Sequence, residues 1–181
     1  MDQAHKFSKI TIILHWIVGL SIIGLLISGT IMHEFDIWAL YPIHKSIGMI
    51  VFVVAILRIF WRIKNGWPTP VGKHPRLEKL AAKIVHWVLI IGTVALPISG
   101  MMMSGAGGHG LAIFGLEIMA PNYVDGKAVA HNKTIASIGH TLHEVGAKLI
   151  IIGLVLHVVG ALKHHFKDKD GTLRRMLGKS V

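Results

Sequence analysis

Two histidines in the last third of the chain combine a metal-binding side chain with a spacing that places both on one face of a helix. The stretch from His140 to His165 reads HTLHEVGAKLIIIGLVLHVVGALKHH, and within it His143 and His157 are fourteen residues apart. On an α-helix, fourteen residues bring the second side chain to within about 40° of the first and about 21 Å further along the axis. Because imidazole is the commonest side-chain ligand of metals, such a helix could serve two separate sites stacked across a membrane.

The composition indicates that these histidines lie in a lipid bilayer. The chain has 181 residues, of which 52% are hydrophobic and only 15% are charged, and its mean hydropathy is +0.60. Soluble domains carry about 25% charged residues. We therefore expect one integral-membrane domain over residues 1–181, in contact with lipid. There is no cysteine, which excludes disulfides and iron–sulfur ligation by thiolates.

Four apolar segments are long enough to cross the bilayer as helices. They are predicted at about residues 10–32, 43–61, 84–103 and 140–162, and each has roughly the 17 to 25 residues that span a hydrocarbon core. These segments predict an all-α, four-helix transmembrane bundle. The chain between the third and fourth segments has turn signals, GAGGHG and PNYVDG, around the short apolar run LAIFGLEIM. We expect this connection to cover one end of the bundle without crossing the membrane.

The distribution of basic residues predicts the orientation of the bundle. Lys and Arg concentrate before the first span, between Arg62 and Lys83, and after Leu162. With an even number of spans, these three segments lie on one side of the membrane. Of the nineteen Lys and Arg residues, only four are predicted on the opposite side: Lys45, Lys127, Lys133 and Lys148. By the positive-inside rule, both termini are predicted to be cytoplasmic. The net charge of +10 then has a topological cause, and nucleic acid is not expected as a partner.

Depth in the membrane sorts the histidines of the spans into two pairs. His15 and His157 lie near the cytoplasmic ends of their predicted helices, whereas His44 and His143 lie near the outer ends. A histidine inside a span normally faces the interior of the bundle and has a partner there. Two imidazoles on facing helices are common axial ligands of low-spin haem b, which needs no cysteine motif. The pattern predicts two haem b groups, with these pairs as the ligands of the haem iron.

Three further residues have alternative interpretations. Arg58 lies fourteen residues after His44, at the cytoplasmic depth, where it could neutralise propionates of the inner haem; the alternative is an arginine that extends to the headgroups. His86 could be a third inner ligand, a residue of a quinone site or an interfacial histidine paired with a carbonyl. His140 competes with His143 as the outer ligand, but it lies about 100° away from His157 around the helix, so we favour His143. No side chain is assigned a catalytic role.

The chain resembles the bacterial di-haem cytochrome b561 family, four-helix membrane cytochromes related to the b subunits of hydrogenases and formate dehydrogenases. The resemblance extends over nearly the whole chain and rests on ILHW, IHKSIGM, LRIFWR, WPTP, VHW, ALPISG and HEVGAKLIIIGLVLH. It implies the two ligand pairs named above, a multi-pass protein of the bacterial inner membrane, and electron exchange with quinone. For one branch it implies an oxidoreductase that oxidises superoxide at the periplasmic face, with ubiquinone as the electron acceptor.

The charges at the outer end of this chain differ from those of the superoxide-oxidising branch. Members of that branch present a basic outer surface that attracts an anion. The first outer loop contains Glu34 and Asp36 and has no Lys or Arg before Lys45. Lys45, Lys133 and Lys148 could still cluster near the outer haem. We expect electron transfer from a small-molecule or small-protein donor, superoxide being one candidate. The alternatives are a membrane subunit that relays electrons for a partner dehydrogenase and, from another class, a metal-ion transporter lined by histidines.

Overall fold

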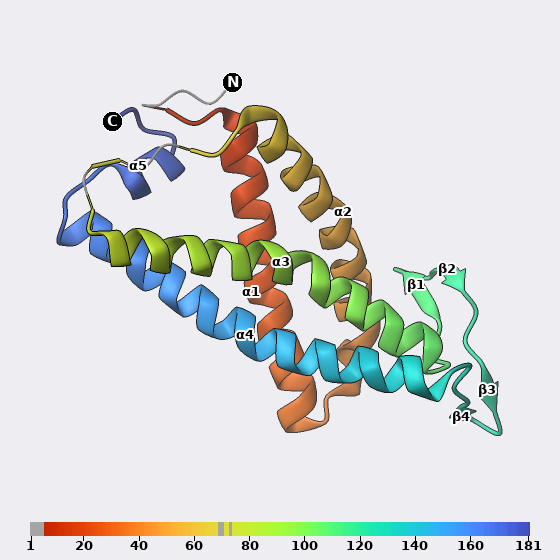
Figure 1. Cartoon of the computed structure of the whole chain (residues 1–181). Coiled ribbons are helices and arrows are strands. Elements are labelled where there is room, and N and C mark those ends of the chain that lie inside the picture. Colours follow the sequence, from red (N-terminus) through yellow and green to blue (C-terminus); the bar gives the residue numbers. More distant parts are fainter. Residues whose placement is uncertain (1–5, 69–70, 73) are drawn as a thin grey trace.

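The computed structural model of the chain describes residues 6–68, 71–72 and 74–181 (Figure 1). Thr69, Pro70 and Lys73, which belong to the WPTP motif and the basic segment, lie outside the described residues. Over the described ranges the elements follow in the order α1 (Lys9–Phe35), η1 (Trp38–Leu40), α2 (Tyr41–Asn65), α3 (Arg76–Ala106), β1 (Leu111–Ile113), β2 (Leu116–Met119), β3 (Tyr123–Val124), β4 (Lys127–Ala128), α4 (Lys133–Phe166) and α5 (Thr172–Met176).

The four long helices α1 to α4 are each long and apolar enough to cross a bilayer, which confirms the predicted fold class. All four extend beyond the spans predicted from hydropathy. The third begins at Arg76 and the fourth at Lys133, because the polar residues before each apolar run also favour helix. With 34 residues, α4 is about 51 Å long, so its ends emerge from a hydrocarbon core of about 30 Å.

Local sequence signals fix where the helices begin and end. The Ser8 hydroxyl caps α1 by accepting a hydrogen bond from the backbone N–H of Thr11 at 3.3 Å. The Asn132 side chain caps α4 in the same way, 3.0 Å from the backbone N–H of Ile135. Gly66 ends α2 with a φ of 72°, which glycine adopts without steric cost. These ends set which residues of each helix lie at the two edges of the bundle.

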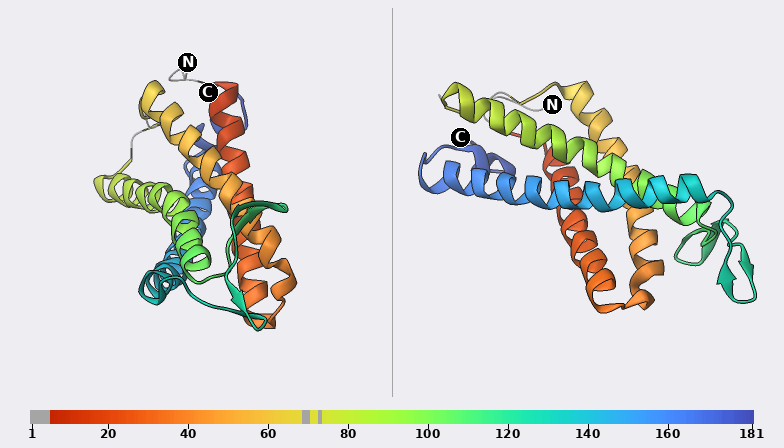
Figure 2. Two further views of the ribbon diagram at one scale, coloured as in Figure 1. Left: turned by 90° about the vertical axis from the view of Figure 1, so that its right-hand side faces the viewer. Right: turned by 60° about the horizontal axis from the view of Figure 1, so that its bottom comes forward.

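The helices pack as two antiparallel pairs, α1 with α2 and α3 with α4, and the pairs cross one another (Figure 1). Both views of Figure 2 keep α3 and α4 side by side. Glycines allow this close approach: a Cβ at Gly92 would lie 2.0 Å from Ile150 Cδ1, and one at Gly139 would lie 2.6 Å from the Met103 backbone nitrogen. Small residues commonly bring membrane helices together in this way.

The connection between α3 and α4 forms two short antiparallel hairpins, β1 with β2 and β3 with β4, at the end of the bundle away from the chain termini (Figure 1). Asp125 and Gly126 form the turn of the second hairpin, both with positive φ, as a two-residue turn of this kind requires. The connection packs on the bundle through Lys45, whose Nζ donates to the carbonyl oxygens of His109 and Gly110 at 3.3 and 2.9 Å. It therefore covers the end of the bundle as predicted.

The buried core is small and lies between the helices. Its main cluster among the described residues consists of Val18, Ile22, Val51, Leu96 and Ile150. Many other aliphatic side chains of the spans face outward, such as Leu20, which is 59% exposed, and Ile91, which is 60% exposed. Outward apolar side chains along four spanning helices are what a lipid environment requires.

Candidate functional site

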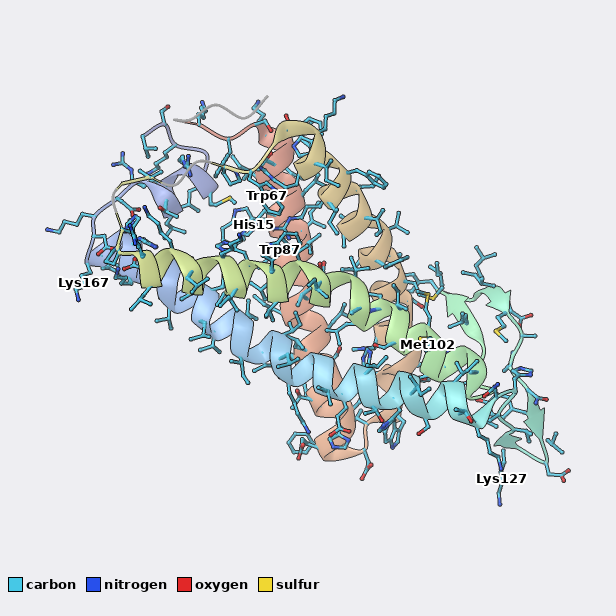
Figure 3. All side chains as sticks on the ribbon, viewed as in Figure 1. His15, Trp67, Trp87, Met102, Lys127 and Lys167 are labelled. Atoms are coloured by element: carbon cyan, nitrogen blue, oxygen red, sulfur yellow. The ribbon has the colours of Figure 1, made fainter. Side chains whose placement is uncertain are left out.

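The structure brings together the two members of each predicted histidine pair. His15 of α1 faces His157 of α4, with ring centroids 6.1 Å apart. His44 of α2 faces His143 of α4, with ring centroids 6.3 Å apart. α4 thus supplies one ring to each pair, and the first two helices supply the partners. Figure 3 shows His15 in the half of the molecule that contains α5.

The distance within each pair suits two imidazoles that bind one metal from opposite sides. With each ring nitrogen about 2.0 Å from a metal, the two ring centroids lie roughly 6.3 Å apart. The centroid separations of 6.1 and 6.3 Å agree with this value. His86 approaches His157 more closely, with centroids 5.2 Å apart, which is too short for the same arrangement. The residues present therefore fit an iron between the rings of each predicted pair.

Hydrogen bonds at the outer pair orient both rings for metal binding. His143 Nδ1 donates to the Leu96 carbonyl at 2.9 Å, and Ser99 Oγ lies 3.2 Å from the same nitrogen. His44 Nδ1 lies 2.8 Å from Ser28 Oγ, whose hydroxyl donates to the Leu25 carbonyl. Because the Ser28 hydroxyl proton is already donated to Leu25, Ser28 Oγ accepts a hydrogen bond from His44 Nδ1–H. Both rings then carry their proton on Nδ1, and the lone pair of each Nε2 is available to a metal.

The inner pair has a different set of neighbours. Arg58 Nη2 lies 3.1 Å from His15 Nδ1, and a guanidinium is a donor only, so His15 accepts this bond. His86 Nδ1 donates to the Ala82 carbonyl one turn earlier in α3, at 2.6 Å. His86 itself is exposed. Arg58 thus lies next to His15 of the inner pair, and His86 lies at the edge of this pair against His157.

Open space beside the histidines leaves room for a flat ligand. Gly19 and Gly48 each lie one turn after a paired histidine, and no atom of the described residues would come within 4 Å of a Cβ at either position. Gly29 and Gly100 lie against the outer rings, where a Cβ would be 3.4 Å from His44 and 3.2 Å from His143. These features fit an apolar macrocycle held between the helices.

Other predicted neighbours of the outer site are not brought together. His140 is exposed, whereas His143 faces the bundle. Lys148 forms an ion pair with Glu144 at 2.7 Å, and its position in α4 is about 22 Å along the helix from Lys133. These two lysines therefore do not form the basic cluster that was considered for the outer end.

Sequence reasoning missed the groups that orient the outer rings. Ser28 and the Leu96 carbonyl are far from the histidines in sequence, and only the register between neighbouring helices places them there. Gly100 belongs to the ALPISG motif and Gly48 to IHKSIGM. A glycine one turn from a membrane histidine was the one available signal, because a missing side chain beside an imidazole leaves space for a ligand.

The chain is similar to known proteins over almost its whole length. Residues 6–179 match the family model described as prokaryotic cytochrome b561. Cytochrome b561 homolog 2 of Escherichia coli (strain K12) is 32% identical over 184 residues, which cover 99% of this chain and 95% of that protein. The probable superoxide oxidase CybB of Yersinia pestis is 29% identical, covering 96% of this chain and 97% of its own length. Cytochrome b561 homolog 1 of Escherichia coli is 26% identical with the same coverage.

Proposed function

The chain belongs to the prokaryotic cytochrome b561 family of membrane electron-transfer proteins, which bind haem b, and from this we propose that it holds two haem b groups and moves electrons across the bilayer to ubiquinone. The observation that carries this proposal is the pair of histidine sites at opposite ends of α4, each completed by a different helix. When bound, haem b supplies one-electron redox chemistry to each site.

His15 and His157 hold the inner haem iron in this proposal, and His44 and His143 hold the outer one. The outer rings are oriented for this role because Ser28 and the Leu96 carbonyl accept from their Nδ1 protons. A metal-bound imidazole almost always donates its second N–H to such an acceptor, which fixes the ring orientation and increases the basicity of the ligand.

Arg58 has a separate task at the inner site. A His15 ring bound to iron through Nε2 carries its proton on Nδ1, which then cannot accept the bond from Arg58 seen here. With haem in the site, the Arg58 guanidinium would no longer be bonded to the ring and would be available to form a charge-assisted pair with a haem propionate.

The apolar core lies between the two sites. Val18 follows His15 by three residues, and Ile150 lies midway between His143 and His157 on α4. These side chains exclude water from the region between the sites, which keeps its dielectric constant low. In this proposal the two redox sites are about 21 Å apart along α4, and the core cluster between them is aliphatic.

The quinone site is placed near His86 in this proposal. His86 is exposed at the edge of the inner pair, and its Nε2 is free to exchange a proton because Nδ1 is bonded to Ala82. The neighbouring Trp87 packs on Trp67, with ring centroids 5.5 Å apart (Figure 3). Flat aromatic surfaces beside a proton-handling group suit a quinone, whose reduction takes up two protons.

The proposed location is the bacterial inner membrane, with both termini in the cytoplasm. The start of α1 and the end of α5 lie at the same end of the bundle, as an even number of spans requires (Figure 1). The basic residues of the chain concentrate at that end, and the positive-inside rule assigns it to the cytoplasm. The hairpins and the His44–His143 pair then face the periplasm.

Superoxide is the proposed electron donor at the periplasmic end. The similar protein from Yersinia pestis is a probable superoxide oxidase. In this chain, Lys45 and Tyr41 line a cavity of about 550 Å³ between α2 and the hairpins, and a lysine in such a cavity attracts a small anion. Two superoxide anions release two electrons and two molecules of oxygen, and one ubiquinone takes up these electrons and two protons to become ubiquinol.

Haem quantitation tests the two-haem proposal. Pyridine haemochrome spectra of the purified protein should give two haem b per chain, and His143→Ala should give one. His140→Ala, the matched control on the same helix, should keep two. Two haems in the His143 variant would contradict the pairing, and no Soret band in the native protein would favour the histidine-lined transporter.

Stopped-flow spectroscopy tests the donor separately. Superoxide should reduce the haem of the purified protein, and superoxide should disappear faster than in a protein-free control. In vesicles, this reduction should be accompanied by ubiquinol formation. If superoxide has no effect while a co-purifying soluble dehydrogenase reduces the haem, the protein is a relay subunit and the superoxide assignment fails.

A further inference from the structure

Four side chains outside the two histidine pairs form a compact group at the end of the bundle that carries both termini. His74 precedes α3, His164 lies in the last turn of α4, and Asp168 and Asp170 lie in the turn between α4 and α5. One ligand-type atom of each side chain lies within 4.8 Å of the others. The labelled Lys167 marks this turn in Figure 3. The group joins segments that are almost one hundred residues apart in the chain.

The distances within the group are those between neighbouring ligands of one small metal ion. His164 Nδ1 lies 2.9 Å from Asp170 Oδ2 and 3.1 Å from Asp168 Oδ2. His74 Nε2 lies 3.5 Å from the same Asp170 oxygen. In a tetrahedral site with bonds of about 2.0 to 2.1 Å, neighbouring ligand atoms lie roughly 3.3 Å apart. Two imidazoles and two carboxylates are a ligand set that zinc accepts.

Two atoms at the centre of the group, His164 Nδ1 and Asp170 Oδ2, are buried. They lie 2.9 Å apart as an ion-pair contact, but neither makes a hydrogen bond of good geometry among the described residues. The Asp170 side chain is only 10% exposed. Its other oxygen accepts from the backbone N–H of Thr172 at 2.8 Å, which turns Oδ2 into the group. Buried polar atoms nearly always have a partner, and a metal ion would satisfy both atoms at once.

Glu78 faces the opposite nitrogen of each ring. Its Oε1 lies 3.5 Å from His74 Nδ1 and 3.7 Å from His164 Nε2, whereas Asp170 faces His74 Nε2 and His164 Nδ1. Metal-binding histidines typically donate their second N–H to a carboxylate, which fixes the tautomer. Glu78 is therefore placed to orient both rings for a metal on the Asp170 side.

The charges of the group also suit a divalent cation. Lys163 forms ion pairs with Asp168 and Glu78, and its hydrogen bond holds the pKa of Asp168 below the usual value. With neutral histidines, three carboxylates and one ammonium leave a charge of −2. A divalent ion would neutralise this charge.

We propose that His74 Nε2, His164 Nδ1, Asp168 and Asp170 bind a zinc ion, with Glu78 orienting the two rings. His74 Nε2 lies 2.8 Å from the Val71 carbonyl oxygen. When zinc binds, His74 Nε2 gives up this hydrogen bond and bonds to the metal instead. The ion ties the start of α3 to the end of α4 and to the turn before α5. Because the Met176 carbonyl at the end of α5 accepts from Trp16 Nε1 at 3.0 Å, the site also holds the segment that packs beside His15.

Zinc titration of the full-length holoprotein tests this proposal. The protein is purified with a tag that contains no histidine, treated with a chelator, and dialysed against Zn²⁺. Elemental analysis should find one zinc per chain, and X-ray absorption at the zinc edge should show nitrogen and oxygen ligands that include imidazole. His164→Ala and Asp170→Asn should abolish saturable binding, and Glu78→Gln should weaken it roughly 10- to 100-fold.

The neighbouring His165 provides the matched control, since its ring packs on Phe166 and is not part of the group. His165→Ala should bind zinc like the native protein, and unchanged haem spectra in all variants would show that each is folded. Binding that persists in both His164→Ala and Asp170→Asn, equal loss in the control, or no saturable binding in the native protein would each overturn the proposal. The last result would leave the group as contacts between histidine rings and carboxylates without a metal. None of these outcomes depends on the number of haems or on the electron donor.

Discussion

Ser28 Oγ lies 2.8 Å from His44 Nδ1, and its own hydroxyl proton is bonded to the Leu25 carbonyl. An acceptor on Nδ1 makes a histidine more electron-donating toward a metal on Nε2, which favours the ferric state. Ser28→Ala should therefore retain the outer haem and raise its reduction potential by tens of millivolts. Ser28→Thr, which keeps the hydroxyl, should restore the native value. Redox titration measures both, and an equal shift in the threonine variant would exclude the hydrogen bond as the cause.

Gly48 lies one turn after His44 and faces open space. If the outer macrocycle occupies this space, a large side chain there blocks it. Gly48→Leu should remove most of one haem per chain, measured by pyridine haemochrome quantitation. Gly24→Leu is the matched control, since Gly24 also faces open space but lies about 180° around α1 from His15. Loss of haem in both variants would indicate a folding defect and not a blocked site.

Arg58 is the positive charge next to His15. A cation beside a haem stabilises the more negative, reduced state, so its removal lowers the potential. Arg58→Gln should lower the potential of the inner haem by on the order of 50 mV, as expected for one charge at moderate distance in a protein of intermediate dielectric constant. The potential of the outer haem should not change. A shift of similar size at both haems would show that the arginine acts through the fold as a whole.

The spans and the two histidine pairs followed from the sequence because both rest on regular geometry. Hydropathy predicts the length of a span. The fourteen-residue spacing of His143 and His157 places both side chains on the same face of one helix. The partners His15 and His44 followed from depth alone, since helices of known direction place side chains of equal depth side by side. Arg58 was placed at the inner pair by the same reasoning.

Contacts between helices could not be predicted in this way. The acceptors of the outer rings, Ser28 and the Leu96 carbonyl, depend on the rotation of α1 and α3 against their neighbours. The group formed by His74, His164 and Asp170 depends on how two loops fold back at one end of the bundle. No pattern within a single segment indicates it, because its ligands do not share a helix face.

Gly92 and Ile150 define the closest packing between α3 and α4, since a Cβ at Gly92 would lie 2.0 Å from Ile150 Cδ1 and 2.5 Å from its Cγ1. The Ile150 side chain is 1% exposed, so it has no free space into which it can move. Gly92→Ala should therefore separate the two helices and destabilise the protein by about 1 to 3 kcal/mol, the usual cost of overpacking. Thermal unfolding followed through the Soret band measures this change. In the double variant Gly92→Ala/Ile150→Ala, the loss of unfolding free energy should be smaller than the sum of the losses of the two single variants, because alanine at 150 lacks both clashing atoms. A loss larger than that sum would show that the two residues do not compete for the same space. Because α4 carries one histidine of each pair, the same Gly92 variant should weaken the retention of both proposed haems together.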